Sequence, residues 1–280
     1  RMKNIKRPVA AHGDDVNNPL GYAVTARDKS VMQMVEVALK QKQVLLAYQP
    51  IMHAHAPYKV AFYEALVRLT DETGRIIPAK EFIHEIETTE LGRIMDCIAL
   101  EKGLRTLARQ PDLRLSINMS ARSIGYPRWI RTLKQGLQRN VTVGERLILE
   151  ITESSAMTVP ELVIAFMNEI QSKGVSFALD DFGAGYTSFR YLRDFYFDIL
   201  KIDGQFIRGI AQNPDNQVLT SALKAIADQF DMLTVAEFVE NREDAVFLAD
   251  LGIDCLQGYF FSAPTISPVW DRNQKDERSA

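Results

Sequence analysis

The sequence repeats one pattern of hydrophobic and polar positions, in which a short apolar run is followed by a polar residue. Eight such runs can be recognised, and the polar residues that end them are Gln49, Glu64, Asn118, Glu150, Asp180, Lys201, Glu237 and Gln257. Short apolar runs of this kind are typical of strands that are buried on both faces. The pattern therefore predicts eight strands, each with a polar side chain at its carboxyl end.

The spacing of these strand ends predicts how the strands are connected. The ends at Asn118, Glu150 and Asp180 are 32 (150 − 118) and 30 (180 − 150) residues apart, which suits a crossover helix between parallel strands. Apolar residues at helical spacing predict helices over residues 28–42, 79–88, 91–109, 160–173 and 217–230, with shorter helices over 188–195 and 241–251. Because 15 residues (64 − 49) separate Gln49 from Glu64, we expect a hairpin and one antiparallel strand there.

Eight strands alternating with helices, without a glycine-rich dinucleotide-binding motif, predict an α/β fold, a TIM-like (β/α)8 barrel with the first strand antiparallel. We expect a linker or N-terminal arm over residues 1–27, the barrel domain over 28–268 and a disordered tail over 269–280. The carboxyl ends of the strands of such a barrel meet at one mouth. The polar residues at the strand ends are therefore expected to share one site.

Composition and charge narrow the classes of function. The 280 residues are 46% hydrophobic and 25% charged, as in an ordinary globular protein, and a net charge of −3 does not favour binding of long nucleic acids. Cys97 and Cys255 form no disulfide framework, which indicates reduced thiols and a cytoplasmic location. No apolar run approaches the ~20 residues of a membrane span, and no signal peptide is visible. The start at Arg1-Met2 suggests that the chain is part of a longer protein.

The predicted mouth is rich in oxygen ligands. Five acids, one amide and one cation meet there, namely Glu64, Glu150, Asp180, Asp181, Glu237, Asn118 and Lys201. Oxygen donors without histidine or cysteine favour hard divalent ions such as Mg²⁺ or Mn²⁺, and the number of acids indicates two metal ions about 4 Å apart. A metal pair suits hydrolysis of a phosphate ester, because it neutralises the phosphate oxygens and lowers the pKa of a shared water. Lys201 could orient that water or the phosphate.

The same residues lie in motifs that resemble a known family. Glu64-Ala65-Leu66-Val67-Arg68 resembles the signature of EAL domains, which are bacterial phosphodiesterases acting on cyclic di-GMP. The resemblance continues in order through residues 48–51, 118–120, 149–153, 180–186, 200–203, 236–240 and 257–259, and covers roughly residues 28–268. A lone Glu-Ala-Leu is common in helices, whereas eight motifs in register are highly specific.

The resemblance implies hydrolysis of one phosphodiester of cyclic di-GMP to linear pGpG with two Mg²⁺ or Mn²⁺ ions. By motif position, one metal would be held by Glu64, Asn118, Glu150 and Asp180, and the second by Asp180, Asp181 and Glu237. Lys201 would hold the attacking water and Gln257 would support the site, while Gln49, Leu66 and Arg68 would contact the substrate and Asp203 a guanine edge. Glu153 resembles the residue that anchors the loop after Asp181 and links it to dimerisation, so a homodimer is expected.

One position departs from the family pattern. Phe238 directly follows Glu237 where the family usually has glycine; a positive φ would make phenylalanine costly, and otherwise its ring packs.

Two other functions compete with the phosphodiesterase. A catalytically inactive cyclic di-GMP receptor or protein-interaction module of the same fold would typically have lost metal ligands, which this chain retains. A metal-dependent barrel lyase that enolises its substrate would also use strand-end carboxylates, Mg²⁺ and a lysine. The complete ligand set and the motifs in register favour the phosphodiesterase.

Overall fold

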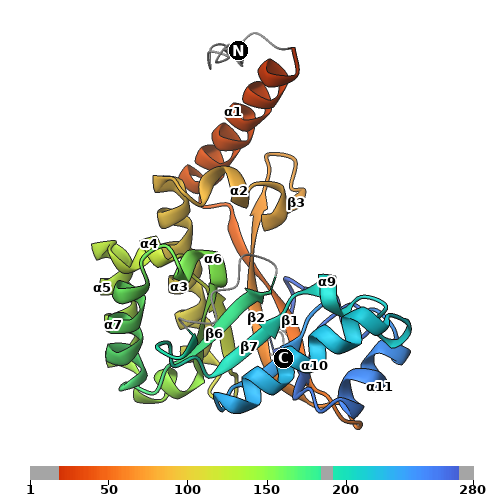
Figure 1. The fold of residues 1–280 in the computed structure, drawn as a ribbon. Helices are drawn as coiled ribbons and strands as arrows, with labels where there is room; N and C mark the ends of the chain where they lie inside the picture. The colour runs from red at the N-terminus through yellow and green to blue at the C-terminus, as the bar shows by residue number, and fades with distance from the viewer. Residues whose placement is uncertain (1–18, 184–191, 271–280) are drawn as a thin grey trace, which may run out of the picture.

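The structure is a computed structural model that describes residues 19–183 and 192–270, and it forms a closed eight-stranded barrel surrounded by helices (Figure 1). In hydrogen-bonded order the barrel strands are β1, β9, β8, β7, β6, β5, β4 and β2, and β1 pairs with β2 to close the ring. The bounds are β1 Val44–His53, β2 Val60–Thr70, β4 Leu115–Asn118, β5 Leu147–Thr152, β6 Ser176–Phe182, β7 Ile199–Ile202, β8 Leu233–Ala236 and β9 Cys255–Leu256. The predicted fold class is confirmed.

The first strand is antiparallel to both of its neighbours, as the short spacing predicts. In the β1–β2 hairpin Gln49 pairs with Glu64 and Ile51 with Phe62, and β1 also runs antiparallel to β9. The prediction ended β2 at Glu64, whereas the strand continues to Thr70 and pairs with a further strand, β3 (Ile76–Pro78). The extension lies beyond the barrel ring, where Leu69 is fully buried in a separate apolar cluster while Leu66, Val67 and Arg68 are half-buried.

Helices follow the strands and cover the outside of the barrel. Their bounds are α1 Pro19–Lys40, α2 Ile83–Ile86, α3 Glu90–Arg109, α4 Ala121–Ile124, α5 Pro127–Arg139, α6 Glu153–Ala156, α7 Pro160–Gln171, α9 Gly204–Ile207, α10 Pro214–Gln229 and α11 Arg242–Asp250, with 3₁₀ turns η2 Ala79–Glu81, η3 Val141–Arg146 and η4 Ile210–Gln212. Side-chain caps start several of them, as where Asn213 accepts from the N–H of Asn216 and Asn241 from that of Asp244. None of the helices in the described ranges is long and apolar enough to cross a membrane.

The folded part extends further than predicted at both ends. Helix α1 begins at Pro19 rather than at residue 28, and proline is favoured at a first helical position, where no backbone N–H is needed. At the other end, the ring of Trp270 packs edge-on against Tyr48 and Tyr63, with centroid distances of 5.3 and 4.6 Å. Residues 1–18 and 271–280, and the first half of the helix expected over 188–195, lie outside the described residues.

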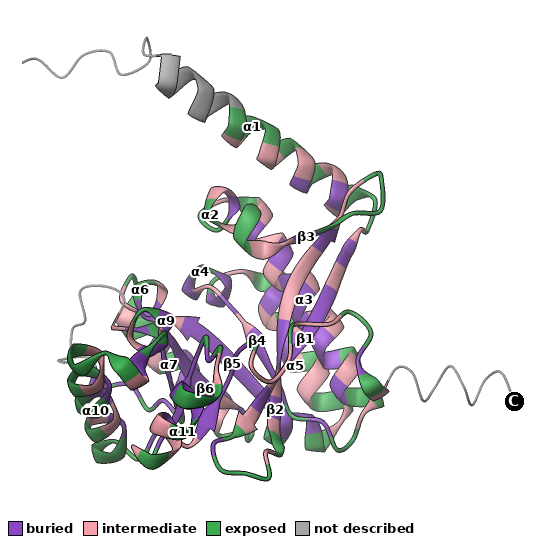
Figure 2. Ribbon diagram, turned by 90° about the vertical axis from the view of Figure 1, so that its right-hand side faces the viewer, coloured by how far each residue is buried: buried purple, intermediate pink, exposed green. Residues whose placement is uncertain are grey.

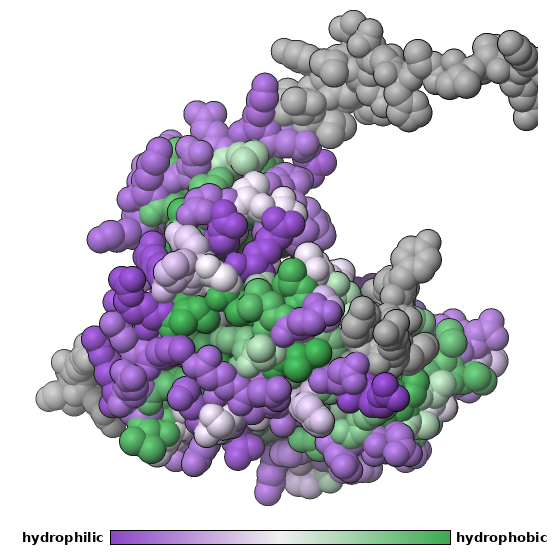
Figure 3. All heavy atoms as spheres, turned by 60° about the vertical axis from the view of Figure 1, so that its left-hand side comes forward, coloured by the Kyte–Doolittle hydropathy of each residue, from purple (hydrophilic) through white to green (hydrophobic). Residues whose placement is uncertain are grey.

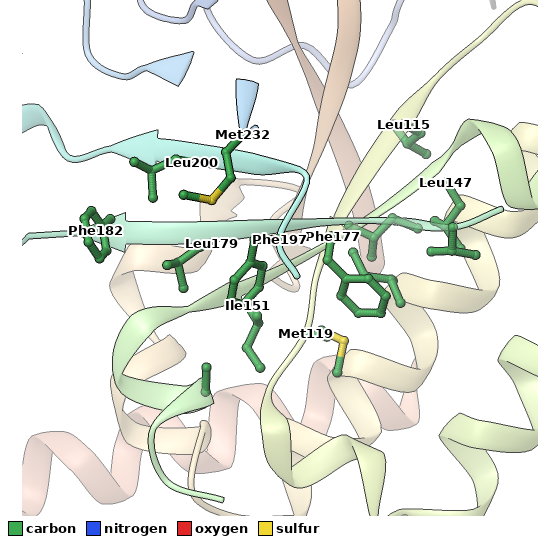
Figure 4. Close-up of a cluster of buried hydrophobic side chains, with 14 of the residues drawn as sticks. Leu115, Met119, Leu147, Ile151, Phe177, Leu179, Phe182, Phe197, Leu200 and Met232 are labelled. Carbon is green, nitrogen blue, oxygen red and sulfur yellow. The ribbon is translucent and has the colours of Figure 1, made fainter. Parts of the chain in front are cut away.

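Apolar side chains form three clusters. The largest joins the strands to the helices outside the barrel, and Figure 4 shows part of it, including Phe177, Leu179 and Leu200. A second cluster joins the β1–β3 extension to the C-terminal half of α1 through Val35 and Ala38, and Figure 2 shows α1 leaving the body from there. The third cluster fills the base of the barrel interior.

Candidate active site

A layer of polar side chains lies directly above the apolar base of the barrel. Strand residues two apart point to the same face of a sheet, so each inward apolar residue is followed by an inward polar one. The pairs are Phe62 and Glu64, Ile148 and Glu150, Ala178 and Asp180, Ile199 and Lys201, Val235 and Glu237, and Cys255 and Gln257, while on the antiparallel β1 Gln49 lies two positions before Ile51. The strand-end residues of the sequence pattern therefore converge on one mouth.

Lys201 lies at the centre of this layer and is 1% exposed. Its Nζ atom lies 2.8 Å from Glu150 Oε2, 2.9 Å from Glu237 Oε1, 3.1 Å from Asp180 Oδ1 and 3.5 Å from Glu64 Oε2. Burial lowers the pKa of the lysine, but the four carboxylates outweigh that effect and hold its pKa well above the ordinary value. Lys201 is therefore a permanently charged ammonium.

Two amide side chains fix Glu64. Asn118 Nδ2 donates to Glu64 Oε1 at 2.9 Å, and Gln257 Nε2 donates to Glu64 Oε2 at 2.6 Å. Gln257 Nε2 also donates to Gln49 Oε1 at 3.1 Å. Burial raises the pKa of Glu64, but the charge of Lys201 and the two amides outweigh it, so that its pKa lies below the ordinary value. Lys201 and the two amides thus favour the ionised form of Glu64.

The other carboxylates compete for the single ammonium. Burial, opposed by Lys201 and reinforced by the charges of Glu64 and Asp180, raises the pKa of Glu150 to about 8. Burial likewise raises the pKa of Glu237 well above its ordinary value, and burial together with Asp180 raises the pKa of Asp181 to about 6. The layer therefore carries more acidic groups than Lys201 alone can keep ionised.

A bulge in β6 turns two neighbouring carboxylates towards the mouth. Leu179 pairs with Leu200 and Phe182 with Ile202, so that three steps on β6 face two on β7, and Asp181 has a φ of 55°. Aspartate tolerates this left-handed conformation better than most residues. Ligand oxygens of Asp180, Asp181 and Glu237 lie within 4.8 Å of one another.

The donor set fits divalent cations. In the described part of the chain, Glu150 Oε1 and Gln257 Oε1 are buried without a hydrogen-bond partner, which costs free energy unless another ligand satisfies them. The grouped acids are all oxygen donors, the ligands that Mg²⁺ and Mn²⁺ prefer. A divalent ion would also offset the excess of negative charge around Lys201.

The residues predicted to contact a substrate lie around this mouth. Leu66 and Arg68 continue the inward face of β2 beyond Glu64, and Gln49 lies opposite Glu64 in the hairpin. Arg68 is half-buried, Nη1 donates to Val67 O at 2.8 Å, and burial lowers the pKa of its guanidinium, opposed by Glu64 and Tyr259.

Asp203 and Glu153 lie where two loops leave the mouth. Asp203 caps α9 by accepting from the N–H of Gln205 at 2.8 Å, and its charge contributes to the raised pKa of Asp181. Glu153 begins α6, is 5% exposed, and its Oε2 accepts from the N–H of Gly183 at 3.3 Å. Glu153 thus contacts the segment that directly follows Asp181.

Phe238 has the positive φ that was one of the two alternatives considered from the sequence. Its φ is 56°, which costs a non-glycine residue on the order of 1–2 kcal/mol. Its ring nevertheless packs, against Gly204 and with the Arg208 guanidinium 4.2 Å from the ring centroid. The first of the two alternatives, a positive φ, is therefore present, and the ring of Phe238 makes these contacts although the residue is 45% exposed.

The sequence pattern did not identify Asp96, an acid on α3 that supports the loop after Asn118. Asp96 on α3 accepts from the N–H of Ser120 at 3.0 Å and from Ser123 Oγ at 2.6 Å, which ties the loop after Asn118 to the helix. Burial raises the pKa of Asp96 to about 6, opposed by these hydrogen bonds. The sequence feature that could have identified Asp96 is its position between Met95 and Cys97, as an acid on the apolar face of a helix.

Comparisons with known proteins agree with this geometry. Residues 32–264 match the family model described as EAL domain. The chain is 31% identical over 255 residues to the cyclic di-GMP phosphodiesterase PdeB of Shewanella oneidensis, covering 90% of this chain and 30% of that protein. It is 32% identical over 243 residues to the cyclic di-GMP phosphodiesterase PdeF of Escherichia coli, covering 85% and 32%. The solved PaMucR phosphodiesterase in complex with c-di-GMP matches with a TM-score of 0.74 at 28% identity, over 87% of this chain and 99% of that one.

The chain spans about a third of the length of the curated relatives that it matches.

Proposed function

The chain belongs to the EAL domain family, and on that premise we propose that it is a phosphodiesterase that hydrolyses one phosphodiester of cyclic di-GMP to linear pGpG. The observation that carries the proposal is the buried acidic layer around Lys201, in which oxygens of Asp180, Asp181 and Glu237 lie within 4.8 Å of one another. A receptor of the same fold would not need this retained cluster of grouped acids.

Two Mg²⁺ or Mn²⁺ ions would be held by the acids and the amide of the layer. The first would take Glu64, Asn118, Glu150 and Asp180, and the second Asp180, Asp181 and Glu237. When bound, such ions neutralise the charge of phosphate oxygens and lower the pKa of a bound water. The buried Glu150 Oε1 without a hydrogen-bond partner and the raised pKa values of Glu150 and Glu237 support this assignment.

The chain's own residues bind and orient the reactants. The Lys201 ammonium, held at the centre of the layer, would donate to the attacking water and keep it in line with the phosphorus. Arg68 would place its guanidinium on a phosphate of the substrate, beside Leu66 and Gln49. Asp203 would accept from a guanine edge, and Gln257 supports the site because it holds both Glu64 and Gln49.

We further propose that Glu153 anchors the loop after Asp181 and that the protein acts as a homodimer. The contact between Glu153 and the N–H of Gly183 supports the first part. Val159 and Leu162, at the start of α7, are 36% and 45% exposed, and Figure 3 shows hydrophobic side chains gathered in the middle of one face of the molecule. We also propose a cytoplasmic location, because Cys97 and Cys255 are free and buried, as is usual for proteins of a reducing compartment.

The direct test is to incubate the protein with cyclic di-GMP and Mg²⁺ or Mn²⁺ and to identify the product by mass. We expect pGpG, and we expect its formation to stop with EDTA and in Glu64→Ala. Tight binding without turnover would instead support the receptor. The absence of both binding and turnover would contradict the proposal and would favour another metal-dependent barrel enzyme.

A further inference from the structure

Backbone strain is concentrated beside the acidic layer. In the described ranges, the non-glycine residues with positive φ are Lys42, Asp181, Asp231 and Phe238. Two of these four lie at the site: Asp181 is one of the grouped acids, and Phe238 directly follows Glu237. Aspartate tolerates this conformation, whereas a bulky aromatic residue does so rarely, and it persists only where surrounding contacts hold it.

The contacts that hold Phe238 come from α9. A Cβ on Gly204 would overlap Cγ and Cδ2 of the phenyl ring, so the ring lies directly on the glycine backbone. Arg208 directly follows α9, donates its N–H to Gly204 O at 3.0 Å, and places its guanidinium 4.2 Å from the ring centroid. Arg208 Nε also lies 3.6 Å from Glu240 Oε1, which ties α9 to the segment after Phe238 a second time.

Backbone contacts hold the same segment from the other side. The N–H of Glu237 donates to Ile202 O at 3.2 Å, and the N–H of Val239 donates to Gln257 O at 2.9 Å. Gly258 lies flat against the Val239 backbone, because a Cβ there would overlap it. Phe238 lies between these two hydrogen-bonded residues, and its ring packs the segment against α9.

Glu237 needs to be held because burial, and to a smaller degree the neighbouring carboxylates, disfavour its charge inside the layer. Its carboxylate is buried beside those of Asp180 and Glu64, and Lys201 is shared among all of them. Burial, to which the charges of Asp180 and Glu64 add, favours movement of the glutamate out of the layer towards water, and the shared Lys201 opposes this movement. A glycine at position 238, as the family usually has, would accept the same φ without strain, but in this chain it would remove the ring contacts with Gly204 and Arg208.

We propose that Phe238, clasped by Gly204 and Arg208, is a positioning residue that holds the Glu237 carboxylate against Asp180 and Asp181, where it serves the second metal ion. The inference rests on the proposed function of the acidic layer. Phe238 itself need not touch the substrate, and its effect is transmitted through the backbone to Glu237.

The test compares Mn²⁺ affinity, measured by calorimetry without substrate, in the wild type, Phe238→Gly, Phe238→Tyr and Asp231→Gly. Phe238→Gly is expected to weaken the more weakly bound Mn²⁺ about tenfold or more without lowering the Tm, as when other supports of metal ligands are removed. Phe238→Tyr keeps the ring and should bind as the wild type does. Asp231→Gly is the matched control, because Asp231 is exposed and has the same φ of 56° at the other end of β8.

Hydrogen–deuterium exchange of the metal-free protein gives a second readout. Amides of residues 236–240 should exchange faster in Phe238→Gly and, to a smaller degree, in Arg208→Ala, but not in Asp231→Gly. Unchanged Mn²⁺ affinity and exchange in Phe238→Gly would overturn the inference while the proposed function stands. A wild-type protein that binds no Mn²⁺ would overturn both.

Discussion

The base and the mouth of the barrel are built from the same strands, two residues apart. At the base, Ile148, Ile199 and Val235 pack into an apolar cluster, whereas at the mouth Glu150, Lys201 and Glu237 form a buried ionic layer. Burying apolar side chains stabilises the fold, but burying ions stabilises it little, since the desolvation cost offsets their attraction. The strands thus combine a layer that stabilises the barrel with one that stability alone does not explain.

This difference indicates that the mouth is arranged for a ligand. Four carboxylates lie within 3.5 Å of one ammonium, and two of them have pKa values raised by burial. Sites where burial and like charges shift pKa values strongly are often functional sites. Variants that change one layer and leave the other intact can therefore separate stability from function.

The largest effect is expected for Lys201→Met, which removes the central charge of the mouth. Without the ammonium the carboxylates are left buried and unpaired, so the free energy of unfolding at pH 8 in EDTA should fall by about 3–5 kcal/mol. Loss of the group proposed to orient the water should lower kcat about 10²–10⁴-fold. Urea denaturation and steady-state kinetics measure the two, and a variant with wild-type kcat would contradict the assignment of Lys201.

Ile199→Ala, two residues earlier on β7, is the matched change at the base. The cavity left in the apolar cluster should lower the free energy of unfolding by about 2–5 kcal/mol. At a temperature where the variant is fully folded, its kcat should equal that of the wild type, because the mouth layer is intact. If kcat falls as far as in Lys201→Met, the two layers are not separable.

The smallest effect, when taken over one pH unit, is a dependence of stability on pH that belongs to the mouth. The folded protein raises the pKa of Glu150 to about 8, so it binds this proton more tightly than the unfolded chain does. The resulting stabilisation is complete below the ordinary glutamate pKa and is lost as pH rises through about 8, by up to about 1.4 kcal/mol per pH unit. Urea denaturation in EDTA should show this loss between pH 6 and 9.

Two controls sharpen the pH measurement. Glu150→Gln should flatten the dependence because the titrating group is gone, and saturating Mg²⁺ should flatten it because the cation favours the ionised carboxylate. A wild-type protein whose stability in EDTA rises between pH 6 and 9 would contradict the charge excess described for the mouth.

The sequence predicts the barrel and its mouth well because one physical rule governs both. A strand that is buried on both faces reads as an apolar run, and the polar residue that ends it marks the mouth, as at Glu150 and Lys201. The hairpin of β1 and β2 followed from chain length alone. These features depend on short stretches of sequence and on the reach of the chain.

Features that depend on pairing between distant segments were not predictable in the same way. Strict alternation would point Asp181 away from the mouth, and only the register between β6 and β7 reveals the bulge that turns it inward. The support of the Asn118 loop by Asp96 and the clasp of Phe238 by α9 likewise join residues from separate elements. The extension of β2 became clear only with its partner β3.

The main proposal is that the acidic layer binds two metal ions and that the β6 bulge creates the second position. It is tested most directly by counting Mn²⁺ ions bound per chain in the wild type and in Asp181→Asn, which keeps the shape and the tolerance of positive φ but removes the charge. We expect two ions in the wild type and one in the variant. One ion in the wild type, or the same number in both proteins, would contradict it.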